Sequence, residues 1–172
     1  MIADTQAVRS IKSEVNLAFK EVTNKIMKKI VSDCKPQQVI FDTLDKLDIK
    51  CEIINHKPLY TMKDGLDIAK RLHVAPCKNL LLCNRQQQFF LVMLMGTKRL
   101  AVKKIASQIG SSHLSFSTDE QLKMLMHAQP GGVSPLGLLF DTENKVQLLV
   151  DTDILALRYV GCHPCINTCS IG

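Results

Sequence analysis

The sequence contains no tryptophan, and aromatic residues make up only 5% of its 172 residues. Proteins that hold single-stranded nucleic acid commonly stack its bases on aromatic side chains. Scarce aromatics therefore argue against base stacking as the main mode of recognition. The formal net charge of +6 still favours a polyanionic partner, so phosphate contacts from Lys and Arg should dominate if nucleic acid binds.

The chain also lacks any apolar run long enough to cross a bilayer. Its first twenty residues include Asp4, Arg9, Lys12 and Glu14, which interrupt the apolar core that a signal peptide requires. Seven cysteines without a secretory signal are typical of reduced thiols rather than of a disulfide framework. We therefore expect a cytoplasmic protein with no membrane partner.

Several catalytic signatures are missing as well. The sequence has no nucleophile elbow, Walker loop, dinucleotide fingerprint or HExxH motif. Serine, cysteine and paired-carboxylate mechanisms thus lack their sequence context. The length suits one domain with an appendage.

What the sequence does contain is a regular succession of apolar patterns. Helical spacing predicts an amphipathic helix at 6–32 and further helices at 36–47, 61–73, 100–109 and 118–128, with a short one from Asp151 or Thr152. Strands are predicted at 50–55, 78–84, 88–95, 113–117, 137–141 and 145–150, including two hairpins. Thr61 with Asp64, and Thr118 with Gln121, have the spacing of helix-capping pairs. Because the alternation has no strict βαβ rhythm, it favours an α/β (mixed α+β) fold with a mixed sheet covered by helices.

The segment from Pro130 to Gly137 holds three glycines and two prolines within eight residues. Proline fixes φ, and glycine reaches φ values that other residues avoid. The segment therefore predicts a shaped loop that either only turns a corner or leaves backbone amides free for a ligand. The candidate amides are those of Gly131, Gly132, Val133 and Ser134.

Two single residues are candidates for chemistry. Lys78 opens an otherwise apolar strand, where it either extends to water or supplies a fixed cation for a phosphate or a carbonyl oxygen. His163 lies between Cys162 and Pro164, where it is either structural or a proton-handling group near neutral pH.

Two clusters complete the candidates. Cys162, Cys165 and Cys169 with His163 suggest zinc, but a second Cys-x2-Cys pair is missing, so we predict no metal and no cofactor. A basic cluster near the start of a predicted helix consists of Lys98, Arg99, Lys103 and Lys104. These residues either form a solvated face or contact phosphates.

The order of these motifs resembles the YbaK/prolyl-tRNA editing-domain family. The motifs are Lys78-Asn-Leu-Leu-Leu, a Lys98-Arg-Leu helix entry, Leu114-Ser-Phe-Ser, Pro130-Gly-Gly-Val-Ser-Pro-Leu-Gly-Leu and Gly161-Cys-His-Pro-Cys-Ile-Asn-Thr. The likeness runs from about Pro36 to Ser170 and is strongest to the free-standing branch that removes alanine from tRNA(Pro). It implies a largely antiparallel curved sheet surrounded by helices.

The resemblance implies a trans-editing enzyme that hydrolyses the ester of mischarged Ala-tRNA(Pro), with prolyl-tRNA synthetase as a further partner. It assigns catalytic roles to Lys78, Gly131 and His163. The substrate-binding residues that it implies are Tyr60, Thr61, Asn79, Gly132, Val133, Ser134, Pro135 and Asn167. Such a reaction needs an oriented water and a place for oxyanion charge, and no covalent nucleophile.

The resemblance also sets the expected domain boundaries. Residues 1–35 lie outside it and form a helical extension that either packs on the domain, binds tRNA or dimerises. Residues 36–172 form the editing-like domain, which is short at its C-terminus because family members continue past the Asn-Thr motif with a further strand and a helix. Three other functions stay open: removal of cysteine instead of alanine, a catalytically inactive tRNA-binding module, and a zinc-dependent module at the cysteine-rich tail.

Overall fold

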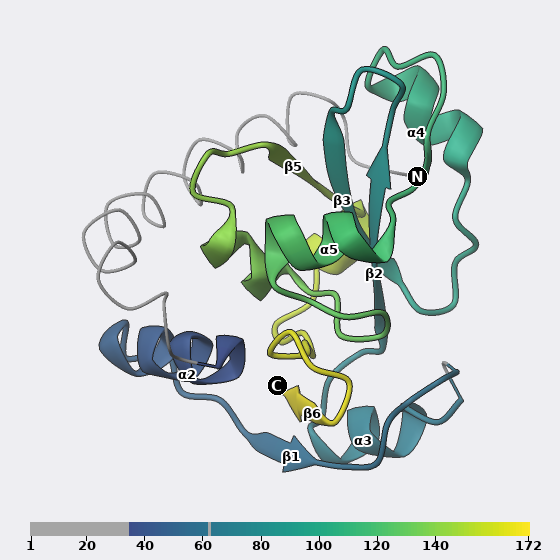
Figure 1. Cartoon of the computed structure of the whole chain (residues 1–172). Coiled ribbons are helices and arrows are strands. Elements are labelled where there is room, and N and C mark those ends of the chain that lie inside the picture. Colours follow the sequence, from purple (N-terminus) through teal and green to yellow (C-terminus); the bar gives the residue numbers. More distant parts are fainter. Residues whose placement is uncertain (1–34, 62) are drawn as a thin grey trace.

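A computed structural model of the chain describes residues 35–61 and 63–172 (Figure 1). The predicted helix at 6–32 lies outside these residues. The first described helix, α2 (Pro36–Lys46), begins with proline at its first position, where a missing N–H costs no hydrogen bond. It buries Val39, Ile40 and Leu44 against the core.

A four-stranded sheet forms the centre of the fold, in the order β4-β2-β3-β5. The strands β2 (Cys77–Cys83) and β3 (Phe89–Met95) form the predicted antiparallel hairpin. The short strand β4 (Ser115–Phe116) adds antiparallel to the end of β2, and β5 (Val146–Val150) adds parallel to β3. The prediction of a mixed, largely antiparallel sheet is therefore confirmed.

Successive residues of the central strands face opposite sides of this sheet. Leu81 and Leu91 pack with Leu122 and Met126 of α5 (Asp119–Met126), which crosses one face in Figure 1. Leu82 packs with Ile105 of α4 (Val102–Gln108) and with Phe90 on the other face. Each fully buried leucine of this kind stabilises the fold by roughly 1.5–3 kcal/mol relative to an exposed one.

The caps of α5 follow the predicted pattern. The Gln121 backbone N–H donates to Thr118 Oγ1 at 3.2 Å, and the Thr118 N–H donates to Gln121 Oε1 at 2.9 Å. Two orphan amides of the first turn are thus satisfied reciprocally, which is typical of a capping box.

A second sheet joins segments that are far apart in the sequence. The strand β1 (Ile53–Asn55) pairs antiparallel with β6 (Cys169–Ile171), with Ile53 opposite Ile171. Sequence patterns predicted β1 but not β6. This pairing places the C-terminal segment beside the loop between β1 and α3 (Leu66–Arg71) (Figure 1).

The structure corrects the predicted strand at 137–141. Residues Pro135–Phe140 form the 3-10 helix η1, which Ser134 begins by accepting a hydrogen bond from the Leu136 N–H at 3.2 Å. The predicted hairpin between 137–141 and 145–150 is therefore also wrong, and β5 pairs in parallel with β3 instead. The helix expected at 61–73 is shorter, because Thr61 and Asp64 close a separate turn before α3 begins. The last helix, α6 (Thr152–Leu155), begins after Asp151 as predicted.

In the described part of the chain, no helix is long and apolar enough to span a membrane.

Candidate active site

A cavity of about 490 Å³ lies along the first residues of β2. On that side β2 has no partner strand among the described residues before Leu82, because β4 pairs only with Leu82 and Cys83. Both faces of the strand therefore reach the cavity at this open edge. The predicted site residues that line it are Tyr60, Thr61, Lys78, Asn79, Gly131, Val133 and His163.

The Pro130–Val133 loop forms one wall of this cavity. Gly131 has a φ of +81°, and a Cβ there would lie 2.6 Å from Asn167 Nδ2. The next glycine, Gly132, leaves no room for a Cβ against the Cys165 carbonyl, and its N–H donates to the Gln129 carbonyl at 2.8 Å. The amides of Gly131 and Val133 make no hydrogen bond within the described residues. Of the four amides predicted to be free, that of Gly132 is thus used by the loop itself.

The remaining predicted loop residues support the cavity instead of lining it. Ser134 is fully buried and caps η1, and Pro135 begins this helix. The side-chain amide of Asn167 binds Leu59, with Nδ2 donating to the carbonyl at 2.7 Å and Oδ1 accepting from the N–H at 3.1 Å. In this structure these three residues hold backbone segments in place.

Lys78 lines the cavity, but its ammonium is already engaged. Its Nζ donates to the Lys98 carbonyl oxygen at 2.8 Å. Lys78 alternates in step with Leu80 and Leu82, so its side chain leaves the sheet on the α4 face. An ammonium has three donors, and one hydrogen bond is recorded here, so the cation keeps donors for a ligand.

Lys98, one of the predicted phosphate contacts, forms ion pairs with two carboxylates. Its Nζ lies 2.7 Å from Asp151 Oδ2 and 2.8 Å from Asp153 Oδ2. Both carboxylates raise the pKa of Lys98, through hydrogen bonds first and charge second, and they neutralise the cation locally. Lys98, Arg99 and Lys104 border a different cavity, of about 350 Å³, between α4 and the sheet. The basic cluster therefore does not share the cavity of Asn79 and Gly131, and Lys103 lies exposed on α4.

Asn79 has the opposite orientation to Lys78 and the same one as Leu81. Its Oδ1 is buried without any hydrogen-bond partner, and it is the only side-chain atom of this kind among the described residues. An unsatisfied buried acceptor costs about 1–3 kcal/mol. Such a group beside a cavity is explained if a bound ligand supplies the missing donor.

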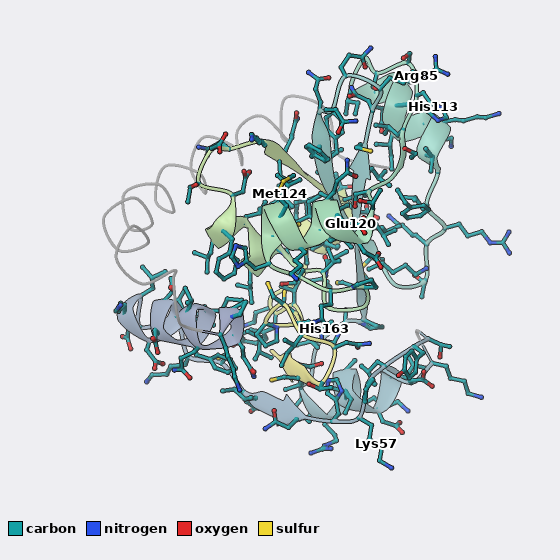
Figure 2. All side chains as sticks on the ribbon, viewed as in Figure 1. Lys57, Arg85, His113, Glu120, Met124 and His163 are labelled. Atoms are coloured by element: carbon teal, nitrogen blue, oxygen red, sulfur yellow. The ribbon has the colours of Figure 1, made fainter. Side chains whose placement is uncertain are left out.

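His163 enters the cavity wall from the segment before β6, close to which it lies in Figure 2. Its Nδ1 lies 2.8 Å from the Cys169 carbonyl oxygen. Since a carbonyl only accepts, Nδ1 carries the hydrogen and Nε2 keeps its lone pair. Burial lowers the pKa of His163 below its ordinary value, the nearby His56 lowers it further, and the Cys169 hydrogen bond opposes both. The ring is thus neutral near pH 7 and can accept a proton.

Sequence reasoning missed two polar residues of this region. His56 Nε2 lies 2.8 Å from Ser170 Oγ, and its Nδ1 lies 2.8 Å from the Lys57 carbonyl. Ser170 lines the cavity, and its hydroxyl also lies 3.4 Å from His163 Nδ1. The only available signal was the pair His56-Lys57 before Pro58, because the β1–β6 pairing that brings these residues together is not local.

The cysteines of the tail are packing residues in this structure. Burial raises the pKa of Cys162 and Cys165 to about 12, which keeps both thiols protonated near neutral pH. Among the described residues, no group of three His, Cys, Asp or Glu side chains is arranged to hold a metal ion.

Comparison with known proteins identifies the fold and the family. The family model described as "Aminoacyl-tRNA editing domain" matches residues 56–172, which include every cavity residue named above. The chain belongs to this family. The resemblance that the motifs indicated is therefore confirmed.

Two curated relatives of this editing-domain protein cover most of both chains. The prolyl-tRNA editing protein ProX of Acetoanaerobium sticklandii is 29% identical over 142 residues, which are 81% of this chain and 85% of the relative. The prolyl-tRNA synthetase associated domain-containing protein 1 of Danio rerio is 26% identical over 131 residues, 75% of this chain and 71% of the relative.

A solved structure shows the same fold. It is described as a candidate trans-editing enzyme for prolyl tRNA synthetase and superposes with a TM-score of 0.62 at 18% identity. The match covers 81% of this chain and 87% of that one.

Proposed function

We propose that this protein is a trans-editing deacylase that hydrolyses the ester between alanine and the 3′ end of tRNA(Pro). The observation that carries the proposal is one cavity lined by a neutral His163, by Asn79 with its unpaired Oδ1 and by the free backbone amides of Gly131 and Val133. Each of these groups has a specific role in the proposed hydrolysis of the ester.

Asn79 recognises the amino acid. Near neutral pH the α-amino group of an aminoacyl ester is a hydrogen-bond donor when protonated, and Asn79 Oδ1 lacks a donor. Hydrogen bonds that involve a charged group are worth about 1.5–3 kcal/mol, so this contact orients the ester carbonyl within the cavity.

Hydrolysis then proceeds by direct attack of water. His163 Nε2 takes a proton from a water molecule whose oxygen forms the new bond to the ester carbonyl carbon. The carbonyl oxygen becomes an oxyanion, which the Gly131 and Val133 amides stabilise. The intermediate collapses with loss of the ribose oxygen, to which His163 returns the proton. The products are free alanine and uncharged tRNA.

Selection among amino acids is steric in this proposal. Leu81, Leu122 and Val133 line the cavity, and in this proposal they leave room for the small alanine side chain and not for the bulkier proline ring. Because Pro-tRNA(Pro) is too large for the cavity, it is not hydrolysed. The enzyme then removes only the smaller amino acids that prolyl-tRNA synthetase has attached in error, which is the second step of a double-sieve mechanism.

A deacylation assay with Ala-, Cys-, Ser- and Pro-tRNA(Pro) tests the proposal. We expect rapid loss of alanine, slow loss of cysteine and serine, and intact Pro-tRNA(Pro). Faster release of cysteine than of alanine assigns the protein to cysteine removal instead. Salt-sensitive tRNA binding with every ester left intact identifies a non-catalytic tRNA-binding module and overturns the proposal.

A further inference from the structure

Two aromatic side chains on the cavity wall are largely exposed to solvent. Among the described residues, Tyr60 and Phe116 are the only tyrosine and phenylalanine that line it, and 85% and 60% of their surfaces are exposed. The other phenylalanines of the described part lie buried or partly buried in the core, and they are Phe41, Phe89, Phe90 and Phe140. A ring that lines a cavity and still meets solvent lies at the mouth of that cavity.

The backbone beneath each ring is held in place. The amide of Tyr60 donates to Asp64 Oδ2 at 3.2 Å, and the preceding Leu59 is bound on both backbone groups by Asn167. Phe116 lies in β4 directly opposite Leu82, and the following Ser117 N–H donates to the Leu81 carbonyl at 3.0 Å. The two rings therefore come from different walls, the β1–α3 loop and the sheet edge, and both are presented by ordered backbone.

The proposed reaction determines which part of the tRNA lies at the mouth of the cavity. The ester carbonyl occupies the cavity, and it is bonded directly to the ribose of the terminal nucleotide. The base of that nucleotide, or of the one before it, must then lie just outside the cavity. These bases are unpaired, and unpaired bases are commonly held by stacking on aromatic rings.

We propose that Tyr60 and Phe116 form a stacking subsite for the unpaired 3′-terminal bases of the tRNA. This inference rests on the proposed function, because it takes the ester in the cavity as its starting point. It gives a use to two exposed rings in a chain with few aromatic residues. It also revises the expectation from composition that phosphate contacts dominate recognition. Two aromatic rings are sufficient for base stacking when they lie at the position that the bases occupy.

Equilibrium binding of two acceptor-stem minihelices tests the subsite without requiring hydrolysis. Both probes carry alanine in a stable amide link at the 3′ end, one on adenosine and the other on a ribose without a base. We expect the wild-type protein to bind the adenosine probe about 5- to 100-fold more tightly, the range that stacking of one base provides. Tyr60→Ala and Phe116→Ala should each reduce this ratio, while Tyr60→Phe should keep it.

Tyr159→Ala is the matched control, because Tyr159 is 57% exposed but does not line the cavity. This variant should leave the ratio unchanged. Equal wild-type affinity for the two probes overturns the subsite, and so does an equal loss of affinity for both probes in the Tyr60 and Phe116 variants. If the ratio behaves as expected while no aminoacyl-tRNA is hydrolysed, the subsite stands and the proposed activity fails.

Discussion

Asn167 binds both backbone groups of Leu59, although the two residues are separated by 108 positions in the sequence. The same side chain fills the space in which a Cβ of Gly131 would lie, with 2.6 Å from that position to Asn167 Nδ2. One asparagine amide thus sets the distance between two walls of the cavity, the β1–α3 loop and the Pro130–Val133 loop. The wall that carries Tyr60 and the wall that carries Gly131 depend on each other through this contact.

Gly131→Ala should therefore damage both stability and activity. Its φ of +81° costs an alanine about 1–2 kcal/mol, and the clash with Asn167 adds to this. Displacement of Asn167 moves the cavity walls, so we expect kcat/KM for deacylation to fall by about 100-fold. Gly110→Ala is the control, because Gly110 has a φ of +68° but open space around its missing Cβ. In urea unfolding, this variant should lose only the free energy that a positive φ costs an alanine. Its deacylation activity should be unchanged.

Asn79→Leu should separate stability from activity. Removing a buried acceptor without a partner and filling its place with an apolar side chain should raise the free energy of unfolding by about 1 kcal/mol. The same change removes the contact to the substrate amino group, and kcat/KM should fall by about 10-fold or more. Urea unfolding and deacylation measured on the same preparation check the two effects.

Asn84→Leu provides the opposite control. Asn84 is also a buried asparagine of the sheet region, but its Oδ1 accepts from the Gln86 and Gln88 amides. Its replacement should lower the stability and leave the catalytic cavity unchanged. A stability loss at Asn79 as large as that at Asn84 would show that Asn79 has a structural partner, contrary to the proposed role.

Local signals were sufficient to predict much of the fold. The Thr118–Gln121 capping box and the β2–β3 hairpin depend on neighbours within a few residues, and both form as expected. The sequence predicts a strand at 137–141, where the structure has the 3-10 helix Pro135–Phe140, because a short apolar run has no periodicity that distinguishes the two. The strand β6 was missed because it is defined by pairing with β1, more than a hundred residues earlier.

The candidate site, like the fold, could be predicted from local sequence only in part. Most of the catalytic and substrate-binding residues that motif resemblance selected line the cavity, including Lys78, Asn79 and His163. It did not show that Asn79 lacks a partner or that Lys78 binds the Lys98 carbonyl, because both facts depend on how side chains pack in three dimensions. Lys98 was grouped with its basic neighbours for the same reason, although Asp151 and Asp153 neutralise it from another part of the chain.

The salt dependence of tRNA binding separates Lys98 from its neighbour Lys103. A cation that contacts a phosphate contributes about one to the slope of log affinity against log salt. Lys103→Met should therefore reduce this slope by about one, if the exposed face of α4 meets the tRNA backbone. Lys98→Met should leave the slope unchanged and lower thermal stability instead, because it leaves the buried Asp151 carboxylate without its cation. A reduced slope for Lys98→Met would contradict its structural role.

The pH dependence of deacylation should report the ionisation of His163. Burial lowers its pKa below the ordinary value of 6.5, and only the neutral ring can accept a proton from water. As the pH falls, kcat/KM should therefore decline with a midpoint below 6.5. The thiols of Cys162 and Cys165, with pKa values raised to about 12, contribute no change between pH 6 and 9. In His163→Gln the rate should be lower at every pH and the acid decline should be absent. If the decline persists in this variant, or if its midpoint in the wild-type protein lies above 6.5, the proton acceptor is a group other than His163.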